Sequence, residues 1–545
     1  MTRTATSAPS AWPALTGRAR DPWPIAAGAV ALLVAIPVLL VGASLARPSV
    51  DVWRHLWATQ LPELIGNTLA LIVGVGVGVA VLGTGLAWLV TMYRFPGRAV
   101  LEWLLILPLA MPAYVIGFVF LAVFDYTGPV QRALRALVGG PVRWFPDIAS
   151  YGGVVLVMTL VLYPYVYLLA RAAFLEQSET ALEAARALGV SRRAAFWRVA
   201  LPLARPGIVA GVTLALMEAL ADFGTVAIFN YSTFTVAIYR VWFGLFNRRA
   251  ATELATLLVL FTLLLYGAER ALRGRARFDP RDGGGRPVPR TTLAGWRGWG
   301  ASALAAAVVG VAFVLPVVRL VTWIPAGAYD TRYPRFLGHT VAVAAVTALI
   351  AVAAALMVAY GVRQSRRRAV AILARVASMG YALPGSVIAV GVLSLLTWAD
   401  RAIGGLFLIG SLAGLIFAYT VRFLAVGFQA VEAGLARITP SMDMAARSLG
   451  VRPSGVLRRI HVPLLRRSLF TAGLLVFVDV MKEMPATLLL RPLGYDTLAV
   501  RVWQFTSESL WEAAALPALT IVAAGVLPVV VLVRQSSRPR RRRTG

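Results

Sequence analysis

Glu183-Ala184-Ala185-Arg186-Ala187-Leu188-Gly189, followed after nine residues by Val199-Ala200-Leu201-Pro202, is a loop that the chain contains twice. The second copy reads Met444-Ala445-Ala446-Arg447-Ser448-Leu449-Gly450 and ends in Ile460-His461-Val462-Pro463. The two glycines, and likewise the two prolines, are 261 residues apart. Each copy is a short basic stretch between two long apolar runs. The repeat therefore predicts two related halves joined end to end in the same orientation.

Each loop has the signals of a short helix, a turn and a second short helix. Gly189 and Gly450 suit the left-handed position that ends a helix, and Pro202 marks a break before the next apolar run. Thr439 and Pro440 stand where an N-cap and a first-turn proline belong. Such a loop can be a docking surface for a cytoplasmic partner, or it can merely connect two membrane spans. The fixed spacing in both copies favours docking.

Composition places the chain in a membrane. The 545 residues are 59% hydrophobic, with a mean hydropathy of +0.75, which indicates a polytopic membrane protein. The net charge of +29 comes almost entirely from arginine, and Lys482 is the only lysine. The arginines cluster in alternate loops, so the positive-inside rule explains them, and nucleic-acid binding is not expected. Cysteine is absent, which excludes disulfides and thiolate chemistry.

Apolar runs of about 20 residues predict an all-α protein with about twelve transmembrane helices in two homologous sets of six. The first set is 23–47, 65–92, 101–124, 150–174, 205–230 and 251–271; the second is 298–323, 338–361, 371–398, 403–428, 466–490 and 512–533. The first run is longer than the apolar core of a signal peptide, so we expect an uncleaved span rather than a leader.

The expected organisation is a cytoplasmic tail (1–22), a first membrane half (23–271), a flexible cytoplasmic linker (272–297), a second membrane half (298–533) and a basic cytoplasmic tail (534–545). Arginine-rich loops place both termini and both docking loops in the cytoplasm. The basic tail is expected to face membrane lipid. Two parallel halves related by a pseudo-two-fold axis predict a pathway between them.

Acidic residues within the apolar runs repeat at the same spacing. Glu218 and Asp222 follow the first loop, and Asp479 and Glu483 follow the second, again 261 residues apart. A spacing of four puts each pair on one helical face. Four such acids would cost on the order of 10 kcal/mol if they faced lipid, so they are expected to be buried. They either border a pathway attractive to a cation or simply tie helices together, as Lys482 near Asp479 suggests.

No enzyme site is predicted. The sequence has no phosphate-binding Gly-Lys-Ser/Thr loop, so this chain is not expected to bind ATP or any other cofactor. The three histidines, His55, His339 and His461, lack metal-ligand spacing, and no metal site is expected. The glycines of Gly74-Val75-Gly76-Val77-Gly78 fit close helix packing better than a dinucleotide site.

The loop resembles the Glu-Ala-Ala motif of inner-membrane permease subunits of binding-protein-dependent ABC importers. In that family the loop is a coupling helix that sits in a groove of the ATPase. The residues carried over are Glu183, Ala184, Ala185, Gly189 and Pro202, and Asp443, Ala445, Ala446, Gly450 and Pro463. The second copy departs from the motif, because Met444 occupies the glutamate position, Asp443 lies one residue earlier, and Val462 replaces a leucine.

The resemblance covers nearly the whole chain, and the fused halves are most similar to ferric-iron permeases. The stretches 220–226 and 481–492 carry that similarity. It implies two copies of a cytoplasmic ATPase, a periplasmic or surface binding protein, and alternating access driven by ATP in the partner. Thiamine, phosphonate or another small solute remains an alternative substrate. A secondary transporter driven by an ion gradient is an alternative of another class, and a non-transporting scaffold is a third.

Overall fold

The computed structural model describes residues 22–46, 50–177, 189, 191–273, 290–324, 330–365, 368–377, 380–405 and 407–536. These residues are almost entirely helical, and eleven helical segments are long and apolar enough to cross a membrane. The all-helical membrane fold is therefore confirmed, with eleven candidate spans where about twelve were expected. The difference lies in α22 (Val462–Met481), which includes the charged residues Arg466, Arg467 and Asp479 and is not among the eleven.

The first half contains the following elements: α1 (Pro22–Ala43), η1 (Ser44–Ala46), α2 (Val50–Thr59), α3 (Leu61–Met92), β1 (Tyr93–Arg94), α4 (Arg98–Leu104), η2 (Leu107–Ala110), α5 (Ala113–Phe124), α6 (Pro129–Val138), α7 (Tyr151–Glu176), α9 (Arg192–Ala195), η3 (Phe196–Ala200), α10 (Leu201–Ala221), α11 (Gly224–Ile228), α12 (Phe234–Phe243) and α13 (Arg248–Arg273).

The second half repeats this order: α14 (Trp296–Val309), η4 (Gly310–Val314), α15 (Leu315–Thr322), α16 (Tyr333–Gln364), α17 (Arg368–Ala377), η5 (Gly380–Ala382), α18 (Gly385–Ile403), α19 (Leu412–Leu435), α20 (Pro440–Ser448), α21 (Pro453–Val456), η6 (Leu457–His461), α22, α23 (Pro485–Leu490), α24 (Leu498–Ser507) and α25 (Trp511–Ser536). The strand β2 (Thr291–Thr292), which precedes α14, pairs in parallel with β1.

The halves match element by element. The helices α3 and α16 each contain 32 residues, and a π-helical turn, η3 or η6, leads directly into α10 or α22. Both α10 and α22 are followed by a break and a short helix, α11 or α23. The expected uninterrupted spans over 205–230 and 466–490 are therefore wrong: α10 ends at Ala221 and α22 at Met481.

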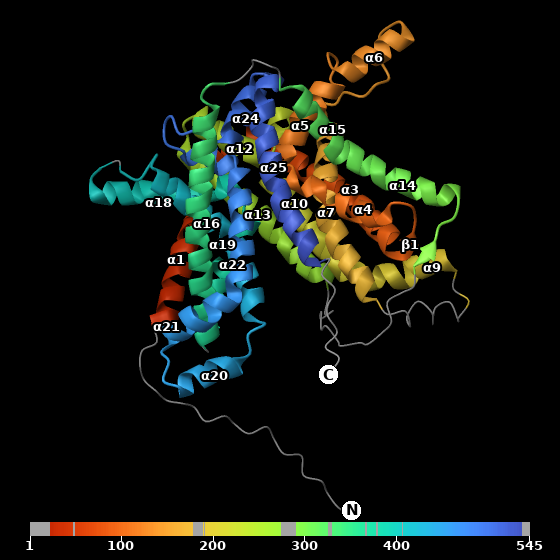
Figure 1. Ribbon diagram of the computed structural model, residues 1–545. Coiled ribbons are helices and arrows are strands. Elements are labelled where there is room, and N and C mark those ends of the chain that lie inside the picture. Colours follow the sequence, from red (N-terminus) through yellow and green to blue (C-terminus); the bar gives the residue numbers. More distant parts are fainter. Residues whose placement is uncertain are drawn as a thin grey trace, which may run out of the picture.

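The first helices of the halves are exchanged. The helix α1 of the first half packs on α16, α17 and α18 of the second half, whereas α15 of the second half packs on α5 of the first half. The two hydrophobic cores are mixed accordingly, because one combines α3, α5 and α7 with α14 and α25, and the other combines α16, α18 and α19 with α1 and α13. Figure 1 shows α14 and α18 projecting to opposite sides of the bundle. Exchange joins the halves over a large apolar surface.

Close helix packing in the first half depends on glycine, as the glycine-rich run on α3 predicted. A Cβ at Gly83 would lie 2.7 Å from Val166 Cβ and 2.9 Å from the Tyr163 carbonyl oxygen, both on α7. A Cβ at Gly85, two residues along the same helix, would meet nothing within 4 Å. The α3–α7 contact therefore excludes a side chain at Gly83 but not at Gly85.

We expect Gly83→Ala to lower the free energy of unfolding by about 1–3 kcal/mol, because overpacking forces the backbones of α3 and α7 apart. Gly85→Ala is the matched control and should leave stability unchanged or raise it by up to about 1 kcal/mol through helix propensity. The measurement is the thermal unfolding midpoint of the purified protein in detergent. Equal midpoints for the two variants would contradict this account of the packing.

Candidate functional site

The second docking loop forms the helix-turn-helix expected from its sequence. Thr439 has extended backbone angles before α20, and Pro440 is the first residue of that helix. Gly450 has a φ of +76°, and its N–H donates to the Arg447 carbonyl oxygen at 2.9 Å. Ala446 is buried, whereas Ala445 and Pro463 are exposed. Because α21 and η6 then lead into α22, the loop is joined directly to a membrane helix.

The first docking loop is described only in part. Glu183, Ala184 and Ala185 lie outside the described residues. Gly189 has a φ of +79°, which matches Gly450, and Pro202 is the second residue of α10. The Ser191 hydroxyl accepts a hydrogen bond from the Ala194 N–H at 3.3 Å at the start of α9. Figure 1 shows α9, α20 and α21 at the same end of the bundle, opposite α6 and α24.

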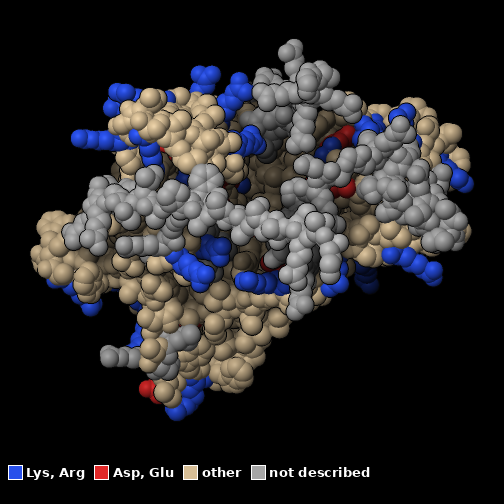
Figure 2. All heavy atoms as spheres, turned by 90° about the horizontal axis from the view of Figure 1, so that it is seen from below, with Lys and Arg blue, Asp and Glu red and all other residues tan. Residues whose placement is uncertain are grey.

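This end of the bundle is strongly basic. Figure 2, which looks onto it, shows many more basic than acidic side chains. Exposed arginines of the second loop and the start of α22 are Arg447, Arg452, Arg458, Arg459, Arg466 and Arg467. Apolar side chains are also exposed on and beside α20: Met442 is 47% exposed, Met444 50% and Leu449 82%. A short helix that exposes three large apolar side chains at one end of a bundle is typical of a surface that a partner covers.

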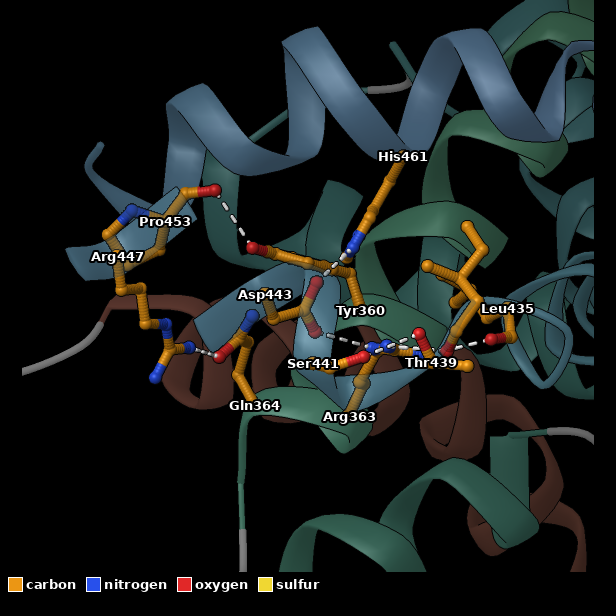
Figure 3. Close-up of polar contacts among 11 residues, drawn as sticks. Tyr360, Arg363, Gln364, Leu435, Thr439, Ser441, Asp443, Arg447, Pro453 and His461 are labelled. Atoms are coloured by element: carbon orange, nitrogen blue, oxygen red, sulfur yellow. Dashed lines mark hydrogen bonds and ion pairs between the residues drawn. The ribbon is translucent and has the colours of Figure 1, made fainter. Parts of the chain in front are cut away.

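Asp443 points in the opposite direction, into the protein (Figure 3). Its carboxylate accepts from Arg363 Nε at 2.9 Å and lies 2.6 Å from His461 Nε2. The Arg363 guanidinium also donates to the carbonyl oxygens of Leu435 and Ile438, at 2.7 and 2.9 Å. The neighbouring Tyr360 hydroxyl donates to the Pro453 carbonyl oxygen at 2.8 Å, and Arg447 is hydrogen-bonded to Gln364. We call Arg363, Asp443 and His461 the loop anchor.

The four membrane acids lie around one cavity of about 120 Å³ between the halves, the central cavity. Glu218 and Asp222 line it from the first half, and Asp479 and Glu483 from the second. The other polar side chains in its lining are Tyr114, Tyr165, Tyr381, Arg422 and Lys482. The prediction that the acids avoid lipid agrees with this arrangement. Among the described residues, no three histidine, aspartate or glutamate side chains converge as ligands for a metal ion.

Asp222 and Glu483 have matching structural roles. Asp222 accepts from the Thr225 and Val226 N–H groups at 2.9 and 3.3 Å, at the start of α11. Glu483 accepts from the Ala486 and Thr487 N–H groups, both at 3.2 Å, at the start of α23. Both carboxylates thus satisfy the free N–H groups of a short helix. They lie just beyond the ends of α10 and α22, so the expected placement of each pair on one helical face is wrong.

One ion pair at the cavity joins two helices, and another lies at the end of a single helix. Glu483 accepts from Arg422 of α19 at 2.7 Å, and its side chain is only 2% exposed. A Cβ at Gly385 would lie 2.5 Å from Glu483 Oε1, so the glycine leaves the space that this pair occupies. Asp479 pairs with Lys482 at 2.8 Å. Glu483 therefore ties the end of α22 to α19, whereas Asp479 pairs with a residue at the end of its own helix.

Glu218 and Asp222 form no ion pair among the described residues, and the Glu218 carboxylate is hydrogen-bonded to the Tyr381 hydroxyl. Tyr165 is hydrogen-bonded to Tyr381 in turn. The Tyr114 hydroxyl lines the cavity, is buried, and has no hydrogen-bond partner among the residues that the structure describes. The cavity thus combines four carboxylates, two cationic groups and three phenols. This combination carries excess negative charge and offers oxygen atoms to a small polar solute.

Sequence reasoning missed the residues that complete both sites. Arg422, Tyr114, Tyr165 and Tyr381 come from elements other than the acid-bearing helices, and no fixed spacing links them to the acids. Tyr381 does lie in Gly380-Tyr381-Ala382-Leu383-Pro384, which parallels the first-half stretch 107–112, and this repeat is the sequence signal that could have found it. Arg363 lies in an arginine-rich loop, so the sequence marks it only as a positive-inside residue.

At the opposite end of the bundle, Arg501 is held by its surroundings. It donates to Asp330 at 3.1 Å and lies 4.8 Å from the Phe336 ring centroid. Partial burial tends to raise the pKa of Asp330, but hydrogen bonds from Arg332 and Arg501 outweigh it and hold the pKa below its ordinary value. This carboxylate is therefore a fixed negative charge, and it fastens the start of α16 to α24.

The fold and these sites define a class: a polytopic helical membrane protein of two parallel halves, with paired loops at one end and a polar cavity between the halves. The model of one family, binding-protein-dependent transport system inner membrane components, matches residues 79–326 and 348–542. The chain belongs to this family.

Relatives agree with the family assignment. The chain is 29% identical over 487 residues to the Fe(3+)-transport system permease protein FbpB 2 of Haemophilus influenzae, covering 88% of this chain and 90% of the relative. It is 28% identical to the sulfate permease CysT of Escherichia coli over 45% of this chain and 89% of the relative. It is 32% identical to the molybdenum permease ModB of Escherichia coli over 32% of this chain and 71% of the relative.

Family membership confirms several expectations. The protein is a multi-pass inner-membrane permease subunit of an ABC importer, and it works with a separate ATPase and a binding protein. It is a transport subunit without a catalytic domain and binds no cofactor, since ATP is used by the partner. The ion-gradient-driven transporter and the scaffold are therefore wrong.

Proposed function

We propose that this permease imports ferric iron, and that the ion passes through the central cavity between the halves. The observation that carries the proposal is the charge of that cavity. Four carboxylates line it against two cationic groups, so an anion entering it would meet excess negative charge. Sulfate and molybdate, the substrates named for shorter relatives, are anions. The full-length relative named for Fe(3+) transport supports the same choice.

The size of the cavity supports a small ion over a large solute. Its volume of about 120 Å³ has room for several water molecules. Pockets that hold drug-sized ligands are larger, roughly 300–1,000 Å³. Thiamine is of that larger class. The absence of three convergent ligands among the described residues suits passage, because a pathway must attract an ion without retaining it.

Coupling follows from the two loops at one end of the bundle. We propose that they face the cytoplasm, with both termini, and that two copies of the ATPase dock on residues 183–202 and 444–463. Positive charge supports this orientation. The exposed Met442, Met444 and Leu449 offer the apolar contact that docking requires. ATP-driven closure of the ATPase pair would then open the pathway toward the binding protein.

The test is transport in proteoliposomes that contain the permease with the ATPase and binding protein that co-purify with it. We expect ATP-dependent uptake of radiolabelled ferric iron, and no uptake of sulfate, molybdate or thiamine. Uptake of an oxyanion or of thiamine without iron would refute the iron assignment while leaving the family assignment intact.

Two cavity variants separate net charge from local pairing. We expect Glu218→Gln, which removes a carboxylate that has no cationic partner of its own, to slow iron uptake about tenfold, equivalent to about 1.4 kcal/mol. The double variant Asp479→Asn, Lys482→Met removes one acid and one cation, so the excess charge is unchanged and uptake should fall much less. Initial uptake rates at equal permease content provide the comparison.

A control for that comparison uses exposed acids. The double variant Asp51→Asn, Glu63→Gln changes the same residue types outside the cavity and should transport iron at the normal rate. If Glu218→Gln transports normally, or if the charge-neutral double variant is the slower of the two, the cavity charge does not guide the ion.

A further inference from the structure

The loop anchor lies in the second half. It joins three elements, because Arg363 is at the end of α16, Asp443 on α20 and His461 at the last position of η6. His461 is fully buried, and Asp443 and Arg363 are 13% and 19% exposed. Arg363 also holds the end of α19 through the Leu435 and Ile438 carbonyl oxygens. The anchor thus fixes α20 to the ends of two membrane helices and to the start of α22.

The corresponding positions of the first half cannot form this anchor. A shift of 261 residues relates Asp443 to Leu182 and His461 to Ala200. The helices α3 and α16 are related by 272 residues, which places Thr91 opposite Arg363. The first half therefore has Leu, Ala and Thr where the second has an acid, an imidazole and a guanidinium.

The acid of the second loop is also turned away from the docking surface. Met444, at the glutamate position of the motif, is 50% exposed, whereas Asp443 is directed at Arg363 and His461 (Figure 3). The carboxylate of Asp443 thus makes its contacts within this chain rather than with a partner. The exposed surface of α20 is left apolar and basic.

One helix, α22, connects the loop anchor to the central cavity. His461 directly precedes α22, and α22 carries Asp479 near its other end, with Lys482 and Glu483 just beyond. The 20 residues of α22 span about 30 Å. A displacement of α20 therefore reaches the cavity through the buried hydrogen bond between Asp443 and His461 and then along α22.

We propose that Asp443 is a positioning residue that rigidly couples the second docking loop to α16 and α22, so that the two ATPase contacts are mechanically unequal. The second half follows the movement of its ATPase subunit through the anchor. The first half follows without these three groups at the corresponding positions. This inference rests on the proposed docking of the ATPase on α20. The experiment below distinguishes a failure of this inference from a failure of the docking proposal or of the iron assignment.

The test copies the first half into the second. The triple variant Arg363→Thr, Asp443→Leu, His461→Ala removes all three anchor groups together and leaves no buried charge unpaired. It is reconstituted with the ATPase and the binding protein that co-purify with the wild type. Three quantities are measured: the affinity for the ATPase, the basal rate of ATP hydrolysis, and the stimulation of hydrolysis by the binding protein. None of them depends on which substrate is carried.

We expect ATPase affinity and basal hydrolysis to stay within about twofold of the wild-type values. Stimulation of hydrolysis by the binding protein should fall by about fivefold or more, a factor typical of coupling between two sites. Asp443→Asn, which keeps the shape of the side chain, should show a smaller loss of this stimulation. If the triple variant does not fold, the result for Asp443→Asn tests the proposal instead. The control Arg54→Thr, Asp51→Leu removes an exposed ion pair and should change nothing.

Two results would overturn the inference. Unchanged stimulation in the triple variant or in Asp443→Asn would mean that the anchor only stabilises the fold. Loss of ATPase affinity in Asp443→Asn would mean that the acid contacts the ATPase itself. If wild-type α20 does not bind the ATPase at all, the docking proposal fails first, and charged substitutions on α20 would reveal this separately.

Discussion

The double variant Met444→Asp, Leu449→Asp is expected to lose ATPase binding by about a hundredfold or more. Burying a large apolar side chain contributes about 1.5–3 kcal/mol, and two carboxylates in the same contact reverse that contribution. Both side chains are at least half exposed on the free permease, so the substitutions should not disturb its fold. The measurement is equilibrium binding of the purified ATPase subunit to permease in nanodiscs, with ATP-dependent transport as a second readout.

Leu493→Asp is the matched control for the docking variant. Leu493 is fully exposed, and the nearby Tyr495 stacks on His339, close to the start of α16 and far from the end of that helix that contacts α20. Its substitution should leave ATPase binding unchanged. Normal ATPase binding by the Met444, Leu449 double variant would contradict the assignment of α20 as a docking helix.

Arg422→Met should be among the most destabilising single substitutions in the membrane part of the chain. It would leave Glu483, 4% exposed, as a buried carboxylate without its ion-pair partner. Removing one partner of a buried pair costs about 3–5 kcal/mol. We expect a marked fall in the thermal unfolding midpoint, followed through intrinsic tryptophan fluorescence.

Substituting Glu483, the partner of Arg422, in the same chain provides the control. Adding Glu483→Gln to Arg422→Met removes the unpaired charge and should recover much of the lost stability, because the glutamine oxygen can still accept from one of the two N–H groups, that of Ala486 or that of Thr487. The exposed pair Arg54–Asp51 is a reference, where Arg54→Met should cost less than about 1 kcal/mol. If the double variant is no more stable than Arg422→Met, the interaction between the two side chains is not what stabilises this region.

The repeat in the sequence predicted the features that depend on local pattern. Apolar runs marked the membrane helices. Glu218 and Asp479 have the same offset as Asp222 and Glu483, and this repeat indicated that the four acids lie in related positions, which are in the lining of the central cavity. Gly450 and Pro440 marked the ends of α20 because their backbone preferences act locally. Each of these signals lies within one element or repeats at a fixed distance.

Features created by contact between distant segments could not be predicted in the same way. The break after Ala221 is stabilised by Asp222 binding N–H groups of α11, and an apolar run gives no sign of it. Arg363 and Asp443 are 80 residues apart, and His461 looked isolated because its partner is an acid rather than a metal. The exchange of α1 between the halves is equally invisible, since any apolar helix of that length can cross a membrane on either side of the bundle.

Site-specific crosslinking from both loops tests the central claim that the ATPase drives this permease through its two docking loops. The chain has no cysteine, so Ala184→Cys and Ala445→Cys each introduce a unique thiol for a photoactivatable crosslinker. In inside-out vesicles that contain the full transporter, we predict that each variant crosslinks to the ATPase subunit. Failure of either position to crosslink to a nucleotide-hydrolysing subunit, or labelling of either thiol from the outer face, would contradict the account.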